Sequence, residues 1–90
     1  MASPIVAELI QEYAARFRDD DGTLYVVSAH GEERSDGTWA GWLEFVPALG
    51  DGRSLTTGQE TSQPNRDALV YWASGLEPLY FEGAFARAAR

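Results

Sequence analysis

The stretch that decides the fold is Trp39-Ala40-Gly41-Trp42-Leu43-Glu44-Phe45-Val46-Pro47, an aromatic-rich run that predicts a strand closed by proline. Successive side chains of a strand point to opposite faces, so Trp39 and Leu43 share one face while Trp42 and Glu44 share the other. Each face therefore carries a tryptophan. We expect helices to cover the Trp39 side. The Trp42 side then needs either a terminal segment of the chain or a partner to cover it.

Length, composition and charge restrict the classes of function. Ninety residues form one domain, and 44% hydrophobic residues are typical of a globular chain. There is no cysteine, which excludes disulfides and the usual zinc sites and favours the cytoplasm. A net charge of −7 repels phosphate backbones, so nucleic acid is not an expected partner. No apolar run approaches the roughly 20 residues of a membrane span, and the amino end lacks an export signal.

The amino-terminal segment predicts an amphipathic helix of about fourteen residues, by the four-residue spacing typical of one helix face. Ser3 is a candidate N-cap and Pro4 a candidate first helical residue. The apolar positions that repeat every four residues are Ile5, Leu9, Tyr13 and Phe17. The acidic run Asp19–Asp21 then ends the helix, and we interpret it as a solvated turn rather than a cation site.

Three strands follow in the prediction. Residues 23–29 form the first, residues 39–47 the second, and the threonine-rich residues 53–61 a weaker third with Gly58 at an edge or bulge. Residues 30–37 form the loop of a hairpin that ends in an Asp-Gly turn, and residues 50–52 form another turn.

A second helix is expected from Pro64 to Gly75, since apolar residues recur there at helical spacing and glycine supplies a stop. The tail, residues 79–90, fits both periods, and we predict a fourth short strand to Glu82 followed by a helical turn or two. The prediction is thus a single α+β domain over residues 1–90, with helices packed on one face of a three- to four-stranded, mainly antiparallel sheet. The expected element order is α-β-β-β-α-β(α).

Motifs for common chemistry are missing from the sequence. His30 is the single histidine, and we expect it on an exposed loop rather than in a catalytic triad. Lysine is absent, so there is no phosphate-binding loop of the usual kind. No cofactor or metal is expected, and the sequence favours a non-enzymatic protein.

The order of helix, strands and helix is similar to double-stranded RNA-binding domains and to the partner-binding domain of HicB-type antitoxins, although residues 64–67 lack the lysines of the former. A closer resemblance rests on residues 37–47, 60–64 and 71–84, which cover about half of the chain and resemble a family of small bacterial proteins of uncharacterised function. This resemblance implies a bacterial, cytoplasmic protein and brings no activity with it.

Two hypotheses remain open. The first is a protein-interaction module, self-associating or bound to another protein, whose candidate surface comprises Tyr25, Trp42, Glu44 and Glu60. The alternative is a small-molecule or metal site built on the sheet carboxylates Glu44 and Glu60, because two neighbouring carboxylates can hold a cation or share a proton.

Overall fold

The computed structural model describes residues 7–49 and 52–89, and in these residues the strands precede the helices. The elements are β1 (Glu8–Arg18), β2 (Leu24–Glu33), β3 (Trp39–Pro47), β4 (Leu55–Thr56), β5 (Thr61–Gln63), α1 (Arg66–Ser74) and α2 (Pro78–Ala88). All strand pairs are antiparallel, in the order β1-β2-β3-β4 with β5 also paired to β3. The predicted α+β class and mainly antiparallel sheet are confirmed.

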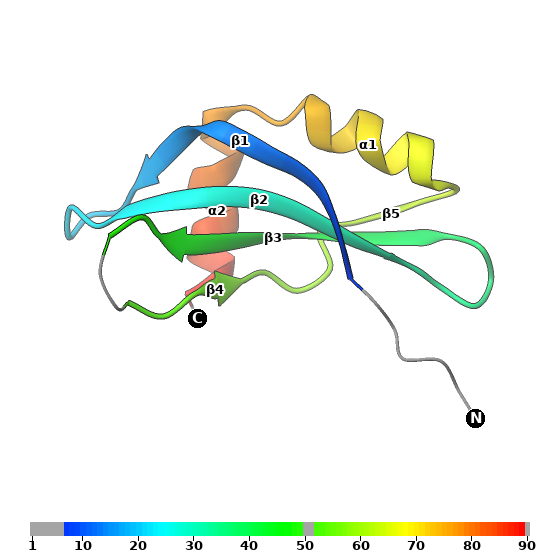
Figure 1. Cartoon of the computed structure of the whole chain (residues 1–90), viewed down its shortest axis with the longest axis horizontal. Helices are drawn as coiled ribbons and strands as arrows, with labels where there is room; N and C mark the ends of the chain where they lie inside the picture. The colour runs from blue at the N-terminus through cyan, green and yellow to red at the C-terminus, as the bar shows by residue number, and fades with distance from the viewer. Residues whose placement is uncertain (1–6, 50–51, 90) are drawn as a thin grey trace.

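The β2–β3 hairpin is the regular centre of the sheet. Its register runs without interruption from Tyr25 opposite Pro47 to Glu33 opposite Trp39. Alternation therefore places the buried residues Val27, Leu43 and Phe45 on one side of the sheet, here called the core face. Figure 1 shows α2 crossing behind β2 and β3.

Both helices pack on the core face. Leu69 of α1, which is fully buried, lies directly over the paired glycines Gly31 and Gly41. Phe85 of α2 packs against Phe45 at a ring-centroid distance of 5.2 Å and against Tyr25 at 5.1 Å. The described chain thus has two layers, a sheet and a helix layer, and measures 22 Å along its shortest axis.

The side of the sheet that faces away from the helices is here called the open face. Its residues follow from the strand register, because residues paired across strands share a face. They include Leu9, Glu12 and Arg16 of β1; Val26, Ser28, His30 and Glu32 of β2; Trp42, Glu44 and Val46 of β3; and Thr56 of β4.

The predicted first helix is wrong, because residues 8–18 form β1. The four-residue spacing does not distinguish a helix from a strand, because residues four apart in a strand also share a face. The strand β1 also has two irregularities: between Leu9 and Gln11 β1 advances by two residues while β2 advances by one, and between Glu12 and Arg16 β1 advances by four while β2 advances by two. Tyr13 and Phe17 pack on the core face, whereas Leu9, before the first irregularity, lies on the open face. The candidate cap at Ser3 and Pro4 lies outside the described residues.

The turns and the third predicted strand differ in detail. The acidic turn is closed by Asp19, whose Oδ1 accepts hydrogen bonds from the N–H groups of Asp21 and Thr23, and Gly22 has φ +85°. Residues 53–61 hold two short strands, β4 and the start of β5, in place of one. The predicted turn at residues 50–52 falls mostly outside the described residues.

The α1 helix is confirmed. Asn65 caps its amino end, since its side chain accepts a hydrogen bond from the N–H of Ala68 at 2.8 Å, and Gly75 caps its carboxyl end. The tail prediction is wrong in its first half, because Pro78 is the first helical residue of α2 and the helix continues to Ala88. The buried residues Phe81 and Ala84 lie on its sheet-facing side.

We expect Gly31→Ala to lower the free energy of unfolding by about 1 to 3 kcal/mol, because an added Cβ would lie 2.3 Å from the Cδ2 atom of buried Leu69. Chemical denaturation measures the change. Gly58→Ala is the matched control: its Cβ would meet nothing within 4 Å, so a change of no more than about 0.5 kcal/mol is expected. Equal effects of the two substitutions would contradict close packing of α1 on the glycine pair.

Candidate functional site

Four neighbouring side chains occupy the centre of the open face. Ser28 and His30 come from β2, while Trp42 and Glu44 come from β3. The register pairs His30 with Trp42 and Ser28 with Glu44, so the four form two adjacent cross-strand pairs. They are here called the central cluster.

The contacts within the central cluster converge on one ring nitrogen. The Nε2 atom of His30 lies 2.9 Å from the Ser28 hydroxyl and 3.4 Å from the nearer Glu44 oxygen. The His30 ring stacks on Trp42 with a centroid distance of 6.3 Å and an interplanar angle of 16°. Ser28 is buried beneath its neighbours, whereas the side chains of His30 and Glu44 are 21% and 33% exposed.

This geometry does not match a catalytic triad. In a triad the histidine uses one ring nitrogen for the serine and the other for the carboxylate, so that the acid orients the base. In the central cluster Ser28 and Glu44 both approach Nε2. The central cluster therefore lacks the serine–histidine–carboxylate geometry of a triad.

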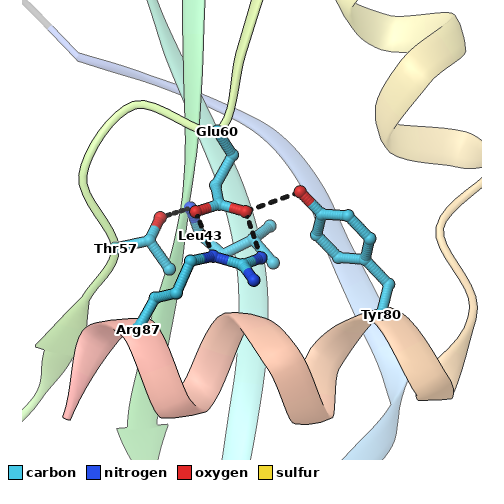
Figure 2. A network of polar contacts seen from close by, with 5 residues as sticks. All are labelled: Leu43, Thr57, Glu60, Tyr80 and Arg87. Atoms are coloured by element: carbon cyan, nitrogen blue, oxygen red, sulfur yellow. Dashed lines mark hydrogen bonds and ion pairs between the residues drawn. The ribbon is translucent and has the colours of Figure 1, made fainter. Parts of the chain in front are cut away.

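The structure separates the four predicted surface residues. Trp42 and Glu44 lie together on the open face, as the strand alternation predicts. Tyr25 lies on the core face, where it is only 8% exposed and contacts Phe45 and Phe85. Glu60 points toward α2 on the helix side, so Glu44 and Glu60 do not form one site (Figure 2).

Sequence reasoning missed the contribution of Ser28 and His30. It ended the first hairpin strand at Ala29 and placed His30 in an exposed loop, whereas β2 continues to Glu33. A signal for the longer strand was present in the apolar–polar alternation of residues 27–30. His30 lies opposite Trp42 because the strand includes it.

A second polar cluster joins the segment between β4 and β5 to α2 (Figure 2). Glu60 accepts hydrogen bonds from the Tyr80 hydroxyl at 2.6 Å and from Arg87 at 2.9 Å and 2.5 Å. The Arg87 guanidinium also lies 5.6 Å from the centre of the Tyr80 ring. In the same segment Thr57 accepts a hydrogen bond from the N–H of Leu43 in β3.

The electrostatics of this second cluster indicate a structural role. The Glu60 side chain is only 6% exposed, and Arg87 holds the pKa of its carboxyl below the usual value against the opposing effect of burial. Burial, assisted by Glu60, raises the pKa of Tyr80 to about 12. The Glu60 carboxylate and the Arg87 guanidinium compensate each other, and their contact joins α2 to the segment between β4 and β5.

A groove of about 450 Å³ lies on the helix side, between the end of β1 and α2. Its lining combines two aromatic residues, Phe17 and Phe85, with the charged residues Arg18, Asp19, Asp20 and Glu82. Asp19 already accepts two backbone hydrogen bonds. The groove is separate from the central cluster, because the sheet lies between them.

Within residues 7–49 and 52–89, no group of three or more histidine or acidic side chains is arranged to hold a metal ion. The helices in these residues are also too short and too polar to cross a membrane. Comparisons of the chain with models of protein families, with curated proteins and with solved structures found no match. The function is therefore inferred from the geometry of the central cluster and the open face.

We expect Arg87→Ala to lower the free energy of unfolding at pH 7 by about 1 to 2 kcal/mol, since it leaves the Glu60 carboxylate without its cation and half of the guanidinium is in water. Because the pKa of Glu60 is lowered in the folded state, this stabilisation is present above its ordinary value of 4.5 and is lost as the pH falls.

Denaturant titrations at several pH values test this expectation. The difference between Arg87→Ala and the unmodified chain should shrink as the pH is lowered below about 4.5. Arg53→Ala, which removes an exposed arginine from the segment before β4, is the matched control and should change stability by less than about 0.5 kcal/mol. A difference that is independent of pH would contradict the role given to Glu60.

Proposed function

We propose that the protein is a non-enzymatic interaction module that self-associates through its open face. One observation carries the proposal: stacked Trp42 and His30 lie at the centre of a sheet face that has no second layer in the described residues. Beside them Leu9 is 52% exposed and Val46 is 36% exposed. Exposed apolar and aromatic side chains that gather on one face of a small domain usually mark a contact surface.

The size of the open face suits a second copy of the chain. Three strands of nine to eleven residues at about 3.3 Å per residue and about 4.8 Å spacing, with the two-residue β4 beside them, give a flat area of roughly 500 Å². Side chains roughen this surface and increase its accessible area. A typical stable interface buries about 800 Å² on each partner, which is of the same order.

The charges of the open face also suit a second copy. The chain as a whole is strongly acidic, with 14 acidic and 7 basic residues. The open face instead mixes signs, since Arg16 and Glu12 of β1 both lie on it. In a two-fold arrangement Arg16 of one copy can therefore lie against Glu12 of the other, which offsets the repulsion between two acidic chains.

The sequence also supports a cellular location and a class of partner. A cysteine-free chain and the resemblance to small bacterial proteins support a bacterial cytoplasmic location. The net charge of −7 supports a protein partner over nucleic acid. The alternative site built on Glu44 and Glu60 has no geometric support, because these carboxylates lie on different sides of the sheet.

Sedimentation velocity over a range of protein concentrations tests self-association. We expect a reversible dimer, and we expect Leu9→Lys to weaken it at least about tenfold, because a lysine there must lose its hydration in the contact. Leu79→Lys is the matched control: Leu79 is a leucine of α2, is 77% exposed and lies in the helix layer, so its replacement should leave the dissociation constant unchanged.

Two outcomes would contradict the proposal. One is a chain that sediments as a monomer at every concentration and whose melting temperature does not change with concentration. The other is a dimer that Leu79→Lys disrupts and Leu9→Lys does not, since this would place the contact on the helix layer.

A further inference from the structure

We infer that docking at the open face takes up a proton on His30, so that self-association strengthens as the pH falls. This inference rests on the proposed function and adds a form of regulation to it. It is carried by the position of Glu44, whose carboxylate lies at the centre of the surface that docking would cover.

Glu44 differs from the other paired carboxylates of the chain in its partner. Glu8 pairs with Arg66 and Glu60 with Arg87, and both of these cations are permanent. The partner of Glu44 in the described residues is His30, with 3.4 Å between Nε2 and the nearer carboxylate oxygen. An imidazole carries a charge only when it is protonated.

Water now compensates the Glu44 carboxylate, since the side chain is 33% exposed. A partner that covers the central cluster removes this water, and a buried carboxylate without a cation is costly. A neutral His30 offers at most one N–H at Nε2, which Ser28 also approaches at 2.9 Å. Protonation of His30 supplies the missing cation at the place where it is needed.

The charged groups nearest to His30 act in the same direction, and the cation of this face, Arg16, lies farther away, opposite Val26. From β1, the apolar Leu9 lies opposite His30 and Glu12 lies opposite Ser28. From β2, Glu32 is two residues farther along the same side of the strand. From β3, the neighbours are Trp42 and Glu44, and no helix packs on this face in the described part of the chain. Loss of water around these carboxylates favours the imidazolium over the imidazole.

The composition allows a pH effect to be assigned to one type of side chain. The chain has one histidine and no cysteine, and its carboxylates ordinarily titrate near pH 4. Between pH 5.5 and 8 the side-chain charge that changes is therefore that of His30. The dependence of the dimer dissociation constant on pH in this range reports the protons taken up, of which the two His30 side chains of a dimer account for at most two.

Sedimentation of the full chain at pH 5.5 and at pH 8, at constant ionic strength, provides the test. We expect the dissociation constant to be at least about tenfold lower at pH 5.5. His30→Gln should give weak association at both pH values, because the cation can no longer form. Glu44→Gln should give tight association at pH 8, because the carboxylate that needs the cation is gone.

Glu82→Gln, which removes an exposed carboxylate from α2, is the matched control and should keep the full pH dependence. Circular dichroism of each variant verifies that it folds. A dimer whose dissociation constant is the same at both pH values, or a pH dependence that persists in His30→Gln, would overturn the inference and leave the proposed function standing. A chain that is monomeric at both pH values would overturn the proposed function itself.

Discussion

The fold depends on the uninterrupted register between β2 and β3. Because nine successive residue pairs match without a bulge, the buried side chains Val27, Leu43 and Phe45 of the hairpin fall on one face. Both helices of the described chain pack against that face. Leu69 fits over the glycine pair Gly31 and Gly41, and Phe85 completes an aromatic cluster with Phe45 and Tyr25. A shift of register by one residue would exchange the core face and the open face.

The parts of the fold that sequence predicted are those specified locally. Trp39–Pro47 is a strand by composition, and α1 begins at a capping asparagine and ends at Gly75. The first segment could not be predicted in this way. Tyr13 and Phe17 lie on one face of β1 at a four-residue spacing that helices and strands share, so periodicity alone gave the wrong element. The tail fits both the strand period and the helix period, so its pattern did not choose between them. In the structure it is a helix whose buried residues face the core.

Half of the central cluster could be predicted from the sequence. Strand alternation alone places Trp42 and Glu44 together on the side away from Leu43 and Phe45. It does not say which residues of the neighbouring strand lie beside them, since that depends on the pairing register and on where the strand ends. Ser28 and His30 were missed for this reason. Tyr25 and Glu60 were assigned to the surface because propensity does not reveal which face the helices cover.

Glu44 and Glu60 show how one residue type acquires two roles through its partners. The Glu60 side chain is almost fully buried, and its carboxylate accepts hydrogen bonds from Arg87 and Tyr80 within the chain. The cost of removing this carboxylate from water is therefore compensated when the protein folds. Glu44 is partly hydrated, and its partner His30 is charged under only some conditions. Folding therefore does not determine the free energy of removing Glu44 from water. This free energy depends on the pH, which sets the charge of His30, and on the molecule that displaces the water. A structural core has no need of such a pair at its centre, whereas a contact surface gains from it a way to form under one condition and separate under another.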